Sequence, residues 1–233
     1  MVLAAALLLG APAALAQVET AAPSAEAWAV LPDWSGDWEV LPGKADPPAP
    51  YNRAWAGKAA RTAAGLKSGK AHDPFATCGL PAGAPRMMSL PGVHEWILRP
   101  GEVRHAVEDG NSVQRIYTGG RQHPDGDDLF ATYTGDNVGH WEGETLVIDT
   151  VGLKSDTWLD GAGRIHSDQT HVVTRLKMTA PNLLEARIQI DDPVAFTRPW
   201  RLVRRYRRLP AGSFVHDYAC GIVGTAARAA KLH

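Results

Sequence analysis

Apolar and polar residues alternate along the second half of the chain. In residues 171–179 the mostly apolar set of alternate positions consists of Val172, Thr174, Leu176 and Met178. In residues 183–191 the corresponding set consists of Leu184, Ala186, Ile188 and Ile190. One apolar face and one polar face are typical of antiparallel strands that pack on a core from one side. The pattern therefore predicts two adjacent strands joined by a turn at Ala180-Pro181-Asn182.

Similar short segments recur from residue 94 onward, bounded by turn-forming residues such as Pro100-Gly101 and Asp109-Gly110-Asn111. The expected strands span residues 94–99, 102–108, 112–118, 129–134, 145–151, 171–179, 183–191, 199–208 and 214–219. One helix is expected over about 52–67, because that stretch is rich in Ala, Arg, Lys and Leu and contains no Pro.

Eight to ten strands joined mostly by short turns predict an all-β, mostly antiparallel domain with one N-terminal helix. The favoured architecture is an up-and-down β-barrel, and a β-sandwich is the alternative. Gly36-Asp37-Trp38, at the head of the β-rich part, resembles the first strand of lipocalin-like barrels. A barrel of this size can hold a small ligand at one mouth.

Residues 1–16 have the composition of a secretory leader. Residues 2–15 are apolar and Ala-rich, and Ala14-Leu15-Ala16 fits a cleavage site. A membrane anchor or a buried first helix is the alternative, although the run is short for crossing a bilayer. We expect a flexible lead-in at 17–33, one domain at 34–223 and a tail at 224–233. The mature protein is therefore expected to be periplasmic or extracellular.

The chain of 233 residues has a formal net charge of −1 and two cysteines, Cys78 and Cys220. A nearly neutral charge argues against nucleic acid as the main partner. An even cysteine count in an exported protein predicts a disulfide between them, with two free buried thiols as the alternative. The Arg-rich run at 201–208 is expected to lie on a solvated strand face and to pair with acids such as Glu185.

Several short motifs are similar to those of a family of uncharacterised secreted bacterial proteins. The longest is Gly139-His140-Trp141-Glu142-Gly143, followed after Glu144 by Thr145-Leu146-Val147-Ile148-Asp149-Thr150. The others are Arg115-Ile116-Tyr117-Thr118, Arg121-Gln122-His123-Pro124, Thr157-Trp158-Leu159-Asp160, His166-Ser167-Asp168, Ile190-Asp191-Asp192-Pro193 and Arg198-Pro199-Trp200. Glu144 stands where the family more often has Asp, and Gly221-Ile222 departs from the family pattern. The resemblance implies a shared fold and supplies no established activity.

Two long polar loops, at 121–128 and 154–169, hold much of the candidate chemistry, because long loops in compact domains are commonly functional. If the strand at 171–179 extends backward, His166 and Asp168 point inward at the barrel mouth and His171 points outward. Asp168 would then orient the His166 ring while the other ring nitrogen exchanges a proton. The alternative is an Asp that caps a turn beside a solvent-facing His.

His140 and Glu142 form a second candidate acid–base pair, which is expected to face the same cavity as His166. In the alternative interpretation both lie in a tight turn and face water, while Trp141 packs. Asp149 is expected to be buried, and a structural role is favoured for it over catalysis, as an acceptor of backbone hydrogen bonds or as a partner of an Arg.

Ligand contacts are expected from His123, Trp141, Trp158 and Asp160, since loop aromatic rings can flank an apolar or aromatic molecule. A metal would need the fold to assemble scattered histidines, namely His123, His140, His166 and His171. No zinc or calcium motif is present in the sequence, so neither a metal nor an organic cofactor is predicted.

The preferred hypothesis is an exported, cofactor-independent isomerase, cyclase or lyase that acts on a small, largely apolar molecule. His140, Glu142, His166 and Asp168 would supply general acid–base catalysis. A non-catalytic periplasmic carrier of a hydrophobic ligand and a metal-dependent hydrolase are the alternatives. No nucleic-acid partner and no stable membrane insertion after leader removal are expected.

Overall fold

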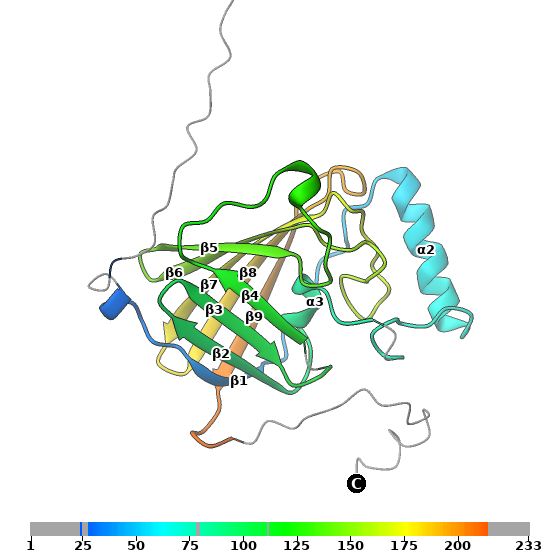
Figure 1. Cartoon of the computed structure of the whole chain (residues 1–233). Helices are drawn as coiled ribbons and strands as arrows, with labels where there is room; N and C mark the ends of the chain where they lie inside the picture. The colour runs from blue at the N-terminus through cyan, green and yellow to red at the C-terminus, as the bar shows by residue number, and fades with distance from the viewer. Residues whose placement is uncertain (1–23, 25–27, 78–79, 111, 214–233) are drawn as a thin grey trace, which may run out of the picture.

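The computed structural model describes residue 24 and residues 28–77, 80–110 and 112–213. Nine strands follow one another in sequence order around a closed barrel (Figure 1). They are β1 (Gly36–Val40), β2 (Val93–Arg99), β3 (Glu102–Val107), β4 (Ser112–Tyr117), β5 (Asp136–Glu142), β6 (Thr145–Val151), β7 (His171–Ala180), β8 (Leu183–Asp191) and β9 (Trp200–Arg208). The predicted barrel of eight to ten strands is confirmed. The sandwich alternative is wrong, because β1 pairs with β9 and closes the sheet.

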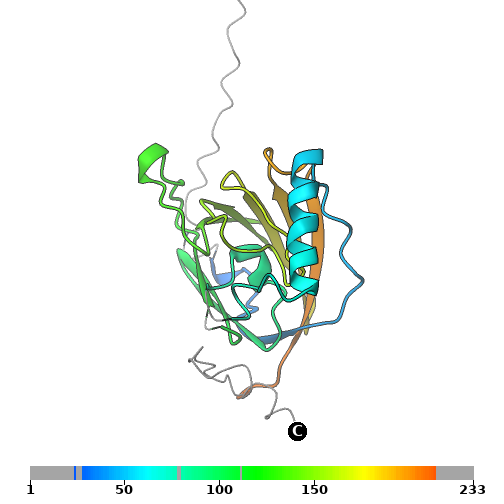
Figure 2. The same cartoon turned by 90° about the vertical axis from the view of Figure 1, so that its right-hand side faces the viewer.

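One seam in the barrel is parallel. Strands that alternate in direction close into a ring only when their number is even, so nine strands need one parallel pair. That pair is β4–β5, whose register contains a single pair of partners, Tyr117 and Val138. The chain returns from the end of β4 to the start of β5 through the long loop at 118–135, which protrudes from the barrel in Figure 2.

The strand expected at 129–134 is wrong. Those residues belong to the 118–135 loop, where Thr132 forms an isolated bridge with Leu153 and Phe130 is 76% exposed. The strand lies instead at 136–142, although Asp, Asn and Gly in this segment disfavour strand formation. Pairing of β5 with β6 along its whole length overrides that local preference.

Large aromatic side chains fill the barrel interior. Trp34, Trp38, Trp96, Trp200 and Tyr206 are fully buried and belong to one apolar cluster with the inward residues of β6, β7 and β8. Burial of such rings removes much apolar area from water, which makes this cluster the main source of stability. The interior is therefore a packed core.

The predicted helix is confirmed as α2 (Arg53–Lys67). Asn52 caps it, because its side-chain oxygen accepts a hydrogen bond from the backbone N–H of Trp55 at 3.1 Å. No residue of α2 is buried, and the helix lies at the side of the molecule, outside the barrel (Figures 1 and 2). The short helices α3 (Ala84–Met87) and η1 (Gly126–Asp128) complete the elements.

Within the described residues, no helix is both long enough and apolar enough to cross a bilayer. Four expectations lie outside the described residues, namely the leader at 1–16, the Cys78–Cys220 disulfide, the strand at 214–219 and the tail at 224–233. They stay predictions of the sequence.

Candidate acid–base site

The outer faces of β5, β6 and β7 carry the ionisable groups that the structure brings together. Ile148, Thr150 and Val172 point into the barrel and are buried. Since side chains alternate along a strand, Asp149 and His171 point to the outer wall. The outward direction expected for His171 is confirmed. The burial expected for Asp149 is not found, because its side chain is 39% exposed.

Five residues form a chain of contacts on this wall. His171 Nε2 lies 2.7 Å from Asp149 Oδ1, and His123 Nε2 lies 3.2 Å from the same oxygen. His123 Nδ1 lies 2.6 Å from Asp136 Oδ1, and Arg121 Nη2 donates to Asp136 Oδ2 at 2.5 Å. We call Arg121, His123, Asp136, Asp149 and His171 the outer-wall cluster. It ties the 118–135 loop to β5, β6 and β7.

His123 bridges two carboxylates, and this fixes its charge. A carboxylate accepts hydrogen bonds, so both ring nitrogens of His123 must carry protons to satisfy Asp136 and Asp149. Burial lowers the pKa of His123, but the two hydrogen bonds outweigh it and raise the pKa above the usual value. The protonated ring and Arg121 together balance the charges of the two acids.

His171 has one ring nitrogen occupied and one available. The Asp149 carboxylate accepts from Nε2, so the neutral ring carries its proton there and Nδ1 is the basic nitrogen. Nδ1 has no hydrogen-bond partner among the described residues. The hydrogen bond to Asp149 raises the pKa of His171, while burial opposes the shift. Burial also opposes ionisation of Asp149, yet the bonds from His123 and His171 hold its pKa well below the usual range.

An open pocket of about 460 Å³ adjoins this cluster, between the start of β7 and the segment at 191–199. His171 lines it together with Gln169, Asp191, Asp192, Pro193, Phe196, Thr197, Arg198 and Pro199. Arg198 is exposed and has no acidic partner among the residues that the structure describes. The pocket therefore combines apolar walls, one unpaired cation and one histidine that is oriented by a carboxylate. It also contains two acids, Asp191, which accepts from Gln189, and Asp192, which accepts from Ser167 and Thr170.

The predicted pair His140 and Glu142 is present, but it lies elsewhere on the outer wall. His140 Nε2 is 3.3 Å from Glu142 Oε1, because both residues lie on the same face of β5. Arg175 on β7 donates to the other carboxylate oxygen at 2.5 Å and holds the pKa of Glu142 below its usual value. Glu142 is exposed and His140 is partly exposed, which fits the alternative of two polar groups that face water, although they lie in a strand and not in a turn.

The expected pairing of His166 with Asp168 is wrong. His166 is buried, with Nε2 3.2 Å from the Thr157 hydroxyl and Nδ1 2.9 Å from the Ser167 carbonyl oxygen and 3.0 Å from Thr170 Oγ1. Asp168 is exposed. The parity argument failed because residues 166–170 form turns and do not extend β7.

His140 and His166 do not share a cavity. His140 pairs in register with Val147, close to the β5–β6 turn, whereas His166 precedes β7, whose first residues pair with Thr150 at the opposite end of β6. The two histidines therefore belong to opposite ends of the sheet. Burial lowers the pKa of His166, so this ring is held neutral inside the loop.

The remaining predicted ligand residues have structural partners. The Trp141 ring lies 6.0 Å from that of Trp34 and packs on the core. Trp158 is only 9% exposed. Asp160 forms an ion pair with Arg164 and accepts a hydrogen bond from the backbone N–H of Ala162 at 2.9 Å. The Asp160 side chain therefore stabilises the turn in which it lies. Of the predicted ligand residues, only His123 lies in the outer-wall cluster.

Asp136 and Arg121 were not predicted as site residues. His171 was predicted to point outward and was considered as one of several scattered histidines, but not as a catalytic residue. The alternation of side chains along a strand is the sequence signal that could have identified part of the cluster, since Asp149 and His171 occupy outward positions of two strands. Their meeting with Asp136 and His123 required the path of the 118–135 loop, which no local pattern gives.

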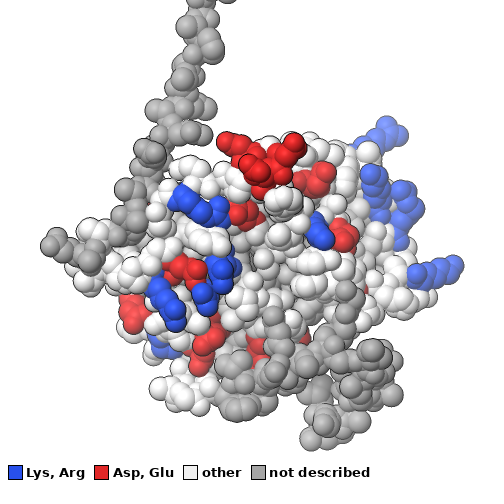
Figure 3. Space-filling view, viewed as in Figure 1, with Lys and Arg blue, Asp and Glu red and all other residues white. Residues whose placement is uncertain are grey.

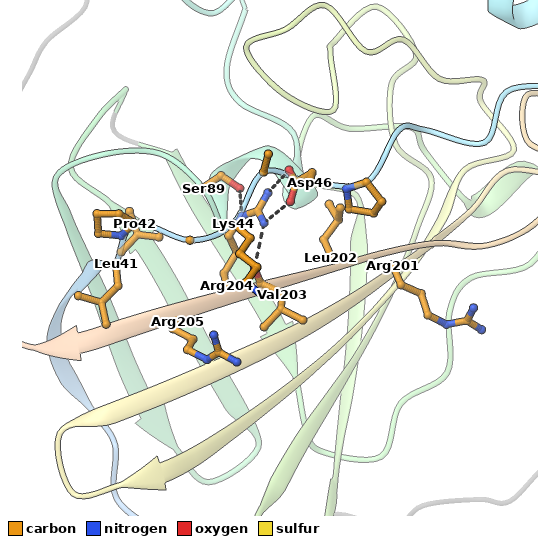
Figure 4. Close-up of a pocket in the computed structure, with 14 residues that line it drawn as sticks. Leu41, Pro42, Lys44, Asp46, Ser89, Arg201, Leu202, Val203, Arg204 and Arg205 are labelled. Atoms are coloured by element: carbon orange, nitrogen blue, oxygen red, sulfur yellow. Dashed lines mark hydrogen bonds and ion pairs between the residues drawn. The ribbon is translucent and has the colours of Figure 1, made fainter.

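A wider cavity of about 780 Å³ lies between the segment at 40–47 and β9 (Figure 4). Arg204 spans it, with both terminal nitrogens 2.7 Å from the oxygens of Asp46 and Nε 2.6 Å from Ser89 Oγ. Arg205 pairs with Glu185 at 2.9 Å, as expected for the Arg-rich strand. The charged groups of this cavity thus fix the segment to the barrel and include no histidine.

Two further histidines lie inside the barrel. His94 Nδ1 is 2.9 Å from His105 Nε2, and His94 Nε2 is 2.8 Å from the Leu90 carbonyl oxygen. Burial lowers the pKa of His94 to about 4 and that of His105 well below its usual value. Both rings are fully buried and belong to the core. Within the described part of the chain, no group of three His, Cys, Asp or Glu side chains is arranged to hold a metal ion.

No protein-family model matches the chain, and no curated protein matches it significantly. Among solved structures, the chain is similar to a secretary abundant heat soluble (SAHS) protein from Ramazzottius varieornatus. The identity is 14%, the match covers 76% of this chain and 95% of that chain, and the TM-score is 0.27. A likeness this distant assigns neither a family nor a function.

Proposed function

We propose that the protein is a general acid–base enzyme that acts on a small molecule at the outer wall of the barrel, with His171 as the catalytic residue. One observation carries the proposal. The Nε2–H of His171 donates a hydrogen bond to Asp149 at 2.7 Å, so the basic Nδ1 is left for a molecule in the adjoining pocket. This geometry is what a histidine needs in order to take up and return a proton.

The other members of the outer-wall cluster position this histidine. Neutral His171 takes a proton from a C–H of the substrate on Nδ1, and the positive ring that forms is stabilised by the Asp149 carboxylate. His171 then returns the proton at a second carbon, which completes an isomerisation without any cofactor. His123 and Arg121 hold the charges of Asp149 and Asp136 in place throughout.

The pocket indicates the class of substrate. Phe196, Pro193 and Pro199 offer apolar contacts, and Arg198 offers one cation without an acidic partner among the described residues. A small, largely apolar acid fits this combination, with its carboxylate on Arg198 and its reactive C–H beside His171. A carrier function is less well supported, because the side chains of Trp34 and its neighbours fill the barrel interior.

Hydrogen–deuterium exchange tests the proposal without knowledge of the product. The protein is incubated in D₂O with a panel of small apolar keto acids and unsaturated acids, and NMR follows the loss of the C–H signal next to the carbonyl or double bond. We expect catalysed exchange with at least one member of the panel. Replacement His171→Gln should slow it by about 10²–10⁴-fold, the usual contribution of a general acid or base.

His140→Gln is the matched control, because His140 is another outer-wall histidine that contacts a carboxylate. It should leave exchange unchanged, and Arg198→Gln should raise KM more than it lowers kcat. Exchange that survives in the His171→Gln protein, or a complete lack of exchange across the panel, would contradict the proposal.

A further inference from the structure

Helix α2 and its flanks carry positive charge without any negative charge. Residues 47–72 contain five cations, namely Arg53, Lys58, Arg61, Lys67 and Lys70, and no Asp or Glu. None of the five forms an ion pair with a residue that the structure describes. Some exposed arginines on the barrel do have such partners, as Arg175 has Glu142 and Arg207 has Glu39. The charge of α2 is therefore not balanced by any acid in the part of the chain that the structure describes.

The cations of α2 share one side of the helix. At 100° per residue, Arg53, Lys58, Arg61 and Lys67 fall within one half of its circumference, and all four are exposed. The other exposed residues of the helix are all Ala, namely Ala54, Ala56, Ala60 and Ala64. The only aromatic residue of the helix, Trp55, is half-buried against the core. Figure 3 shows blue side chains without red ones at the right of the view, where Figure 1 places α2.

We propose that the exposed side of α2 docks the protein onto a membrane surface that contains anionic lipid headgroups. The helix is about 22 Å long at 1.5 Å per residue, and its exposed side is nearly flat because the side chains between the cations are small. A flat helix side lets several cations reach one plane of headgroups at the same time. Each Lys or Arg beside an anionic bilayer strengthens binding by about fivefold at low salt.

A lipid surface fits this side of α2 better than a nucleic acid does. Its outward residues are Ala and cations, so it offers neither an aromatic ring for base stacking nor an amide for reading base edges. Docking of this kind keeps the helix at the surface and needs no insertion.

Vesicle co-sedimentation of the full chain tests the proposal. The probes are vesicles of pure phosphatidylcholine and vesicles with about one third phosphatidylglycerol, at low and at physiological salt. We expect at least about tenfold stronger binding to the anionic vesicles, weakened by salt as Debye screening requires. The triple variant Lys58→Gln, Arg61→Gln, Lys67→Gln should lose most of this binding, up to about 100-fold, because three cations are removed.

The matched control is Arg115→Gln, Arg201→Gln, Arg207→Gln, which removes the same charge from exposed positions on the barrel. It should bind the anionic vesicles nearly as well as the unaltered protein, and circular dichroism checks that both variants are folded. Equal binding to both kinds of vesicle, or equal loss in both variants, would overturn the proposal. Tighter binding to a duplex DNA oligonucleotide than to the anionic vesicles would also overturn it and identify α2 as a nucleic-acid surface.

Discussion

Asp149 is the residue on which the outer-wall cluster depends. It accepts from His171 at 2.7 Å and from His123 at 3.2 Å through one oxygen, so it sets both the orientation and the proton affinity of His171. In the proposed reaction it is a positioning residue, because it does not reach the substrate itself. Its removal should therefore change the pH dependence of His171 as well as the rate.

Replacement Asp149→Asn should lower the pKa of His171, because it removes the carboxylate whose hydrogen bond favours the protonated ring. NMR titration of the histidine ring protons measures the shift directly. Glu142→Gln removes a carboxylate from His140 on the same wall and serves as the control. An unchanged His171 titration in the Asp149→Asn protein would show that the carboxylate does not tune this ring.

At the scale of elements, β5 is the strand that was hardest to foresee and that matters most for the site. It carries Asp136 and forms the parallel seam with β4. Gly139 permits this close approach, because a Cβ at this position would lie 2.8 Å from Ile116 Cγ2 and 3.0 Å from Thr118 Cγ2. The glycine that weakens strand propensity is therefore required where β5 meets β4.

Gly139→Ala should lower the free energy of unfolding by about 1–3 kcal/mol, the usual cost of overpacking a core against side chains that cannot move away. Urea unfolding followed by tryptophan fluorescence measures the change. Gly43→Ala is the control, because an added methyl group there meets no atom within 4 Å. Equal stability of the Gly139→Ala protein would mean that the seam can relax around the added methyl.

At the scale of the whole molecule, two sets of histidines respond to pH in opposite directions. His94 and His105 are buried as neutral rings, and burial lowers their pKa values. Their contribution to stability is present above the unfolded-state value of 6.5 and is lost as the pH falls toward about 4. His123 and His171 have raised pKa values, so their contribution is present below 6.5 and is lost as the pH rises through the folded-state values.

Stability should therefore be greatest near pH 6.5 and fall on both sides of it. On the acid side the fall between pH 6.5 and pH 4 should reach about 3 kcal/mol for His94 alone, because its pKa drops from 6.5 to about 4 and each pKa unit is worth about 1.4 kcal/mol. Urea midpoints measured across this range test the prediction. A double variant His123→Gln, His171→Gln should flatten the alkaline side and leave the acid side steep. A midpoint that stays constant from pH 6.5 down to 4.5 would contradict the assignment of buried neutral rings.

The sequence by itself determined the helix and most of the strands. Strict alternation in 171–179 and 183–191 marks the inward residues of β7 and β8, because the period of a strand is two whatever the fold. The same period placed His171 on the outer wall. The Ala-rich, Pro-free stretch at 52–67 specified α2, since its helix propensity is local.

Only the tertiary structure decided which ionisable groups meet. His166 and Asp168 are two residues apart, yet the turn sends one into the core and the other into water. His123, Asp136, Asp149 and His171 are far apart in sequence, yet they touch because the odd strand number forces a long return loop across β5, β6 and β7. Local patterns record which face a side chain takes, whereas contacts between distant strands depend on register and closure, which the whole barrel sets together.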